Sequence, residues 1–149
     1  MSQRKNKKYT ITCQDYLNFY ELYCVFSAIY IRNTENTFYD WCEISSIYGS
    51  PADCLWGGGR AGFGSDNPEE VLKLTQEYGI SARLTFSNSL LRKEHLTDKK
   101  CNILCKMFEE VGEKRNGVIV HSDLLLKYLE INYPKIIFCI FYDKSVDGF

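Results

Sequence analysis

Strand-like apolar segments alternate with helix-like amphipathic segments from residue 38 to residue 142, and no other feature constrains the fold as much. Strands are expected at residues 38–50, 80–86, 117–121 and 135–142, with helices between them at 66–79, 98–111 and 122–132. Repeated strand–helix–strand units predict a parallel sheet with right-handed crossovers. The expected fold class is therefore α/β. It is either an open parallel sheet of about four strands with flanking helices, or half of a β/α barrel, which usually needs about 250 residues.

The segment before this pattern predicts a long N-terminal helix. Aromatic residues recur there at three- and four-residue spacing, namely at Tyr16, Phe19, Tyr20, Tyr23, Phe26 and Tyr30. Such spacing predicts an amphipathic helix over residues 12–31 whose aromatic stripe packs in the core. Residues 1–9 are basic and no apolar run follows them, so we expect a disordered, solvated tail rather than a signal peptide or a nucleic-acid arm. The sequence shows no internal linker, and a single domain over residues 1–149 is expected.

Charge and cysteine content bear on partners and location. The formal net charge is -1, which gives no reason to expect a nucleic acid or an anionic membrane surface as partner. No apolar run approaches the length that spans a bilayer. Seven cysteines without an export signal predict reduced thiols in the cytoplasm. Cys24, Cys42 and Cys139 lie in apolar runs and are expected to be small core residues.

Residues 57–64 contain five of the ten glycines of the chain. This loop lacks the Gly-Lys-Ser/Thr ending of a nucleoside-triphosphate loop, and its spacing G-x-x-G-x-G reverses the dinucleotide-binding pattern. We therefore expect a structural bend or lid over the sheet. Arg60 is a candidate to meet an anion or a carboxylate, with a surface arginine as the alternative. Trp56 is a candidate to cover a ligand, with a packed tryptophan as the alternative.

Polar residues follow the expected strands at their carboxyl ends, where ligands gather in parallel β/α folds. His121 is the candidate proton shuttle among them, because imidazole titrates near neutral pH. Two of these residues have structural alternatives, since Ser122 can cap the next helix and Asn88 can shape a turn. With the adjoining glycine loop, the candidate ligand-binding residues are Tyr48, Ser50, Trp56, Arg60, Asn88 and Ser122, and Ser87 is placed at the same edge.

Two further constellations carry potential chemistry. Glu43 is a charged residue within an apolar strand, which makes it a candidate catalytic carboxylate. The alternative is a structural ion pair with Arg83 on the neighbouring strand. Cys101 and Cys105 place two sulfur atoms one helical turn apart. Zinc needs two further clustered ligands, and the sequence offers no second pair, so no metal site is expected.

Five segments carry a family resemblance. They read EISSIYGS, LWGGGR, RLTFSNSLL, HLTDKKCN and GVIVHSDLLLKYLEINYPK. As a block they resemble a group of longer TIM-barrel-like proteins from clostridia, over residues 38–135 and more loosely over the N-terminal helix. The resemblance implies a β/α barrel but no particular activity. The second half of the longer proteins carries a cysteine cluster similar to the iron–sulfur barrels of the collagenase-like peptidase and tRNA-hydroxylation group. No cluster ligand carries over to this chain, so no cofactor is expected in it.

Residues 139–149 depart from the pattern of the resembling proteins. With one choice of synonymous codons, a one-base shift of the reading frame turns this segment into VSSTTKVLTD. That string is similar to the continuation in the longer proteins. We therefore expect the chain to be a frameshifted, truncated reading of a longer protein.

The sequence leaves three kinds of function open. The first is the N-terminal half of a β/α-barrel enzyme or ligand-binding protein, inactive alone and able to form homo-oligomers through an exposed strand at 135–142. The second is a self-sufficient small binding or inhibitor protein without catalysis. The third is a complete small enzyme that brings His121, Glu43 and Arg60 into one pocket. We favour the first.

Overall fold

The computed structural model describes residues 46–58, 67–111 and 116–140. The elements within them are β1 Ser46–Gly49, η1 Leu55–Gly57, α2 Pro68–Tyr78, β2 Ser81–Phe86, η2 Lys93–Thr97, α3 Lys99–Glu110, β3 Gly117–Val120, α4 Asp123–Asn132 and β4 Ile137–Ile140, where η marks a short 3-10 helix. The helix expected over residues 12–31 and the tail expected over 1–9 lie outside the described residues. The first half of the strand expected at 38–50 lies outside them as well.

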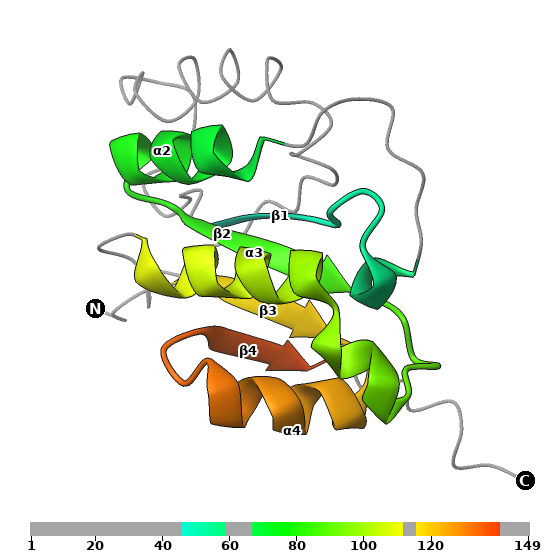
Figure 1. Ribbon diagram of the computed structural model, residues 1–149. Helices are drawn as coiled ribbons and strands as arrows, with labels where there is room; N and C mark the ends of the chain where they lie inside the picture. Colours follow the sequence, from blue (N-terminus) through cyan, green and yellow to red (C-terminus); the bar gives the residue numbers. More distant parts are fainter. Residues whose placement is uncertain (1–45, 59–66, 112–115, 141–149) are drawn as a thin grey trace, which may run out of the picture.

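The strands form one parallel sheet in the order β1-β2-β3-β4, so each strand lies beside the next one along the chain. In Figure 1 the strands run in the same direction, and an α-helix connects each consecutive pair from β1 to β4. In the register of the sheet, Ile47 is opposite Ala82, and Val120 is opposite Ile140. The predicted α/β class and the predicted parallel sheet of four strands are confirmed.

One face of the sheet packs against the three helices α2, α3 and α4. Successive side chains of a strand point to opposite faces, and Leu84 and Phe86 of β2 point to this helix-covered face, where they are fully buried. The same core contains, from strands and helices, Ile47, Ala82, Val118, Val120, Val71, Leu72, Leu74, Leu104, Phe108, Leu125 and Leu129. Burying one such large apolar side chain contributes roughly 1.5–3 kcal/mol, so this layer holds the sheet and helices together.

The opposite face of the sheet is more polar. By the same alternation and register it carries Ser46, Tyr48, Ser81, Arg83, Thr85, Ile119 and Cys139. The guanidinium group of Arg83 donates a hydrogen bond to the sulfur of Cys139 and thereby links β2 to β4. Cys139 was expected to be a core residue, and this prediction is wrong. Its side chain is half-buried because it lies on an edge strand and points away from the helices.

Local sequence signals determine where the helices begin and end. The side chain of Asn67 accepts a hydrogen bond from the backbone N–H of Glu70 at 3.3 Å and caps α2. Gly79 ends this helix with φ at 63°, a conformation that favours glycine. Asp98 and Ser122 cap α3 and α4 through their side chains. These helix starts agree with the helices predicted at 66–79, 98–111 and 122–132.

Strand β4 is an edge of the described sheet. It begins at Ile137, two residues after the expected start, because the chain leaving α4 first makes a turn. In that turn the backbone N–H of Ile136 donates to the carbonyl oxygen of Tyr133 at 3.2 Å. Ile140 in this strand is 42% exposed. The described part of the expected edge strand is therefore apolar, half-buried at residues 137–139 and exposed at Ile140.

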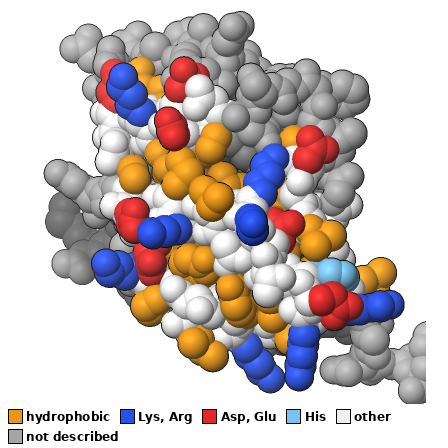
Figure 2. Space-filling view, viewed as in Figure 1, with side chains coloured by type: hydrophobic (Ala, Val, Ile, Leu, Met, Phe, Trp, Pro, Cys, Tyr) orange, Lys and Arg blue, Asp and Glu red, His pale blue; other side chains and the backbone are white. Residues whose placement is uncertain are grey.

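The view of Figure 2 is the same as that of Figure 1 and shows the side on which α3 lies. Lys and Arg side chains are interspersed there with Asp and Glu side chains, and apolar side chains lie between them. Within residues 46–58, 67–111 and 116–140, no helix combines the length and the apolar character that crossing a bilayer requires.

Candidate functional site

The carboxyl ends of the strands bring several of the predicted site residues to one edge of the sheet. Ser50 follows β1, Ser87 and Asn88 follow β2, and His121 and Ser122 follow β3. Because the strands are parallel, these ends lie on the same side of the sheet. We therefore take this edge, with the adjoining η1 turn, as the candidate site.

The η1 turn is fixed onto the end of β2 by hydrogen bonds. The backbone N–H of Asn88 donates to the carbonyl oxygen of Trp56 at 3.0 Å. The side-chain amide of Asn88 donates to the carbonyl oxygen of Leu55 at 2.9 Å. The hydroxyl of Ser87 donates to the carbonyl oxygen of Gly57 at 3.0 Å. The polar groups of residues 87 and 88 thus hold η1 over the strand ends.

Asn88 has its remaining polar atom occupied as well. Its side-chain oxygen accepts a hydrogen bond from the backbone N–H of Leu90 at 3.0 Å. Asn88 therefore shapes the turn after β2, which is the structural alternative that the sequence offered for it.

Among the described residues at this edge, Ser50 has a buried hydroxyl without a hydrogen-bond partner. Its side chain is 3% exposed, and its hydroxyl oxygen makes no hydrogen bond. A Cβ atom at Gly57 would lie 2.7 Å from that oxygen, so the missing side chain of Gly57 is what lets η1 close over Ser50. A buried hydroxyl without a partner costs about 1–3 kcal/mol, which is recovered when a ligand offers a hydrogen bond. Ser50 therefore places a buried hydroxyl without a hydrogen-bond partner beneath η1.

Two other unpartnered hydroxyls lie on the polar face of the sheet, away from the helices. They belong to Ser46 of β1 and Thr85 of β2, and both oxygen atoms are buried. Tyr48, half-buried, lies on the same face between Ser46 and Ser50. This polar face thus continues the candidate site from the strand ends toward the middle of the sheet. The sequence analysis missed Ser46 and Thr85, for which strand alternation was the available signal.

Trp56 is a packed core residue. It is fully buried, and its indole N–H donates to the carbonyl oxygen of His95 at 2.8 Å. Its ring meets Phe86 edge-on at 5.3 Å and Tyr128 at 6.0 Å between ring centroids. Edge-to-face packing of this kind is favourable beyond the buried area. Trp56 is thus a packed tryptophan, which is the alternative to a ligand-covering role.

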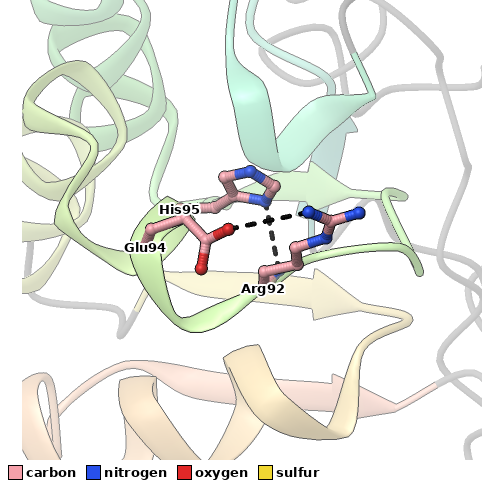
Figure 3. Close-up of polar contacts among 3 residues, drawn as sticks. All are labelled: Arg92, Glu94 and His95. Carbon is pink, nitrogen blue, oxygen red and sulfur yellow. Dashed lines mark hydrogen bonds and ion pairs between the residues drawn. The ribbon is translucent and has the colours of Figure 1, made fainter.

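The η2 turn that receives the Trp56 indole is shown in Figure 3. Nδ1 of His95 accepts a hydrogen bond from the backbone N–H of Arg92 at 3.1 Å, so this imidazole helps to hold its own turn. Arg92 and Glu94 form an ion pair at 3.9 Å, with side chains 77% and 64% exposed. Exposed pairs of this kind contribute little to stability. We assign a structural role to this turn.

His121 and Ser122 differ in their roles at the end of β3. The hydroxyl of Ser122 accepts the backbone N–H of Leu125 at 3.3 Å, so it caps α4, the alternative that the sequence offered. The backbone N–H of His121 donates to the carbonyl oxygen of Phe86 at 3.2 Å, and its side chain is exposed at the edge. Glu43 and Arg60, its proposed partners, lie outside the described residues.

Three cysteines of the described residues are fully buried in the core. Cys54 immediately precedes η1, and Cys101 and Cys105 are on α3. Burial raises the pKa of the Cys105 thiol well above its ordinary value. In the described segments, no group of three or more His, Cys, Asp or Glu side chains is arranged to hold a metal ion. Cys54, Cys101 and Cys105 are free cysteines.

The chain was compared with protein-family models, curated proteins and solved structures. No protein-family model, no curated protein and no solved structure matches the chain. The described residues define a class of architecture: a sequentially ordered parallel β/α sheet that has helices packed on one face and unpartnered hydroxyl groups on the other.

Proposed function

We propose that this chain is the N-terminal half of a β/α-barrel enzyme or ligand-binding protein, and that it is inactive without the other half. The observation that carries the proposal is the strand order β1-β2-β3-β4 with every neighbour parallel. In doubly wound α/β folds the order reverses at a switch point, where the ligand binds. In β/α barrels each strand lies beside the next one in sequence. The described sheet has the second arrangement.

The distribution of side chains supports the same proposal. Right-handed crossovers between successive neighbours place all connecting helices on one face, and α2, α3 and α4 share one core with that face. In a closed barrel the other face becomes the interior, and its upper end becomes the ligand site. Here that face carries the unpartnered hydroxyls of Ser46, Ser50 and Thr85.

The ligand that suits this site is a small polar molecule. Ser50 at the strand end offers a hydroxyl group that both donates and accepts. His121 stands at the end of β3 as the candidate proton shuttle, and Glu43 and Arg60 are proposed to complete the site with it. We expect no cofactor to be held by this chain alone. An iron–sulfur cluster would be contributed by the other half.

The proposal is tested first on the gene. The sequence after the codon for Phe149 is translated in all three forward frames, and the segment from the frame that continues the strand–helix pattern is co-expressed with the full chain. We expect a stoichiometric complex in which amide hydrogen exchange slows at the edge strand β4, because the second half pairs with it.

Matched variants make the test specific. Thr85→Lys places a charge on the polar face, within the expected barrel interior, and should abolish the complex. Thr97→Lys adds the same charge at an exposed position of η2 and should leave the complex intact. If no frame continues the pattern and the chain alone is a stable monomer, the half-barrel proposal is wrong. A self-sufficient binding or inhibitor protein, the second of the functions considered, then becomes the better interpretation.

A further inference from the structure

Asn116 and Gly117 form the one Asn–Gly pair in the sequence. Asn116 immediately precedes β3, and Gly117 is the first residue of that strand. In such a pair the backbone nitrogen of the glycine can attack the side-chain amide carbon of the asparagine, because glycine has no side chain that hinders the approach. Water then opens the resulting ring to aspartate or isoaspartate. The start of β3 thus carries a pair of residues that can change covalently without an enzyme.

The fold requires a glycine at the second position of the pair. A Cβ atom at Gly117 would lie 2.8 Å from the carbonyl oxygen of Ile137, which is closer than real Cβ atoms approach. The atom that it would meet belongs to the backbone of the neighbouring strand β4, which cannot move aside as a flexible side chain can. Gly117 therefore lets the backbones of β3 and β4 approach closely.

The fold also requires the amide group at the first position. The side-chain nitrogen of Asn116 donates to the carbonyl oxygens of Phe108 at 3.1 Å and Val111 at 2.7 Å. These carbonyls lie in the last turn of α3 and at its C-cap, where the helix itself supplies no backbone donor. The side-chain oxygen of Asn116 accepts the backbone N–H of Ala82 at 3.0 Å. A carboxylate cannot replace this amide, because it has no N–H groups to donate.

The folded protein keeps this amide from reacting. Asn116 is 4% exposed, so water and base have little access to it. The nitrogen atom that would leave as ammonia is the one bound to Phe108 and Val111, so both of these hydrogen bonds must break before it departs. The backbone carbonyl of Asn116 is held as well, by the backbone N–H of Ile137 at 2.9 Å. Ring closure therefore requires the end of α3 to separate from the start of β3.

We propose that Asn116 is a deamidation site that is closed in the folded protein and reacts when the chain unfolds, and that the modified chain cannot regain this fold. The backbone nitrogen of Gly117 gives its proton to water or hydroxide and bonds to the side-chain carbonyl carbon of Asn116. The bond from that carbon to the amide nitrogen breaks, and the nitrogen takes a proton and leaves as ammonia. Water then cleaves one of the two ring bonds to the Gly117 nitrogen, which gives isoaspartate or aspartate. No atom is oxidised or reduced, and water is the co-reactant.

The product loses the donors that close the end of α3. An aspartate at this position would set a carboxylate against the carbonyl oxygens of Phe108 and Val111, at the negative end of the helix dipole. A buried charge without a partner is strongly unfavourable. Isoaspartate lengthens the main chain by one carbon atom just before the register pair Gly117 and Ile137. Chemical change in the unfolded state thus makes unfolding irreversible, whether or not the chain is half of a barrel.

The test compares the full, reduced chain in buffer and in guanidinium chloride at the same mildly alkaline pH. Samples taken over time are cleaved after glutamate at acidic pH, where ring closure is slow, and mass spectrometry follows the peptide 114–130. We expect Asn116 to lose its amide nitrogen on the order of a hundredfold more slowly in buffer, because only the small unfolded fraction reacts. Between these conditions the rate should follow the unfolded fraction. Equal rates in buffer and denaturant would overturn the proposal.

Three variants test the chemistry and its consequence. In denaturant, Gly117→Ala should slow the loss of the amide by about tenfold, because its methyl group hinders the attack, and this result needs no variant to fold. Asn116→Asp should lose the cooperative unfolding transition, whereas Asn132→Asp, the same change at an exposed position of α4, should keep it. An unchanged rate in Gly117→Ala would overturn the proposed reaction. Deamidated wild-type chain that refolds to the original unfolding midpoint would overturn the proposed irreversibility.

Discussion

The side-chain oxygen of Asn116 accepts a hydrogen bond from the backbone N–H of Ala82 at 3.0 Å. The amide nitrogen of the same side chain donates to the carbonyl oxygens of Phe108 at 3.1 Å and Val111 at 2.7 Å. The backbone carbonyl of Asn116 accepts from Ile137 at 2.9 Å. One buried residue thus joins β2, the end of α3 and the start of β4.

Replacing Asn116 by alanine should lower the free energy of unfolding by about 2–4 kcal/mol, because buried backbone groups lose their partners. Urea denaturation at neutral pH measures the change. Asn132→Ala is the matched control, since it removes an exposed hydrogen bond to the carbonyl oxygen of Tyr128. We expect that variant to lose less than about 1 kcal/mol. Equal losses in both variants would contradict the role of Asn116.

Trp56→Phe should also destabilise the protein, by about 1–3 kcal/mol, through the lost hydrogen bond to His95 and the smaller ring. Leu55→Ala is the control, because Leu55 is the neighbouring residue and is 38% exposed. Thermal unfolding measures the stability of both variants, and we expect the larger loss in Trp56→Phe. Unchanged stability of Trp56→Phe would contradict the stabilising role of the indole and its hydrogen bond to His95.

Ser50 and Gly57 should be energetically coupled. Gly57→Ala places a Cβ atom 2.7 Å from the Ser50 hydroxyl oxygen and should cost about 1–3 kcal/mol. In the Ser50→Ala background the same change should cost much less, because the clashing oxygen is gone. A double-mutant cycle of unfolding free energies measures this coupling. Strictly additive effects would mean that η1 does not close over Ser50.

The stability contributed by Tyr133 should fall at alkaline pH. Burial raises the pKa of its phenol from 10.0 to about 12. Between these values the unfolded chain releases the proton while the folded chain keeps it, so stability is full below pH 10 and is lost as the pH rises toward 12. Tyr133→Phe removes this titration and the 2.7 Å hydrogen bond to the side-chain oxygen of Asn102.

The measurement is the difference in unfolding free energy between wild type and Tyr133→Phe as a function of pH. The advantage of the wild type should be constant up to pH 10 and should shrink above it. An advantage that grows with pH would contradict the direction of the pKa shift.

The open edge at β4 should control self-association. Ile140→Lys places a charge on this edge, which natural sheets use to block strand pairing. Sedimentation at increasing concentration should show oligomers for the wild-type chain and monomers for this variant. Ile131→Lys, at a position of α4 that is 80% exposed, should behave as the wild type does. If only Ile131→Lys abolishes association, the interface lies on the helices instead.

The sequence predicts which residues lie at the candidate site but not which polar contacts they make. Strand–helix alternation placed Ser50 and His121 at the carboxyl edge, because the ends of parallel strands share one side of a sheet. The same alternation could not say that the hydroxyl of Ser50 lies unpartnered under η1. That depends on the close approach of Gly57, which no spacing in the sequence encodes. The sequence allows either a ligand-binding or a structural role for Trp56, Asn88 and Ser122, and the hydrogen-bond partners of these residues favour the structural role.

The sequence by itself determined the features that depend on neighbouring residues. Helix caps such as Asn67 and Asp98, the stop at Gly79 and the alternation along each strand follow from local backbone chemistry. Only the tertiary structure decided which distant residues meet. The ammonium group of Lys100 meets the carbonyl oxygen of Ala52 because crossover connections bring the loop after β1 against the start of α3. Such contacts are set by the packing of whole elements, to which every residue in the chain contributes and which no short pattern records.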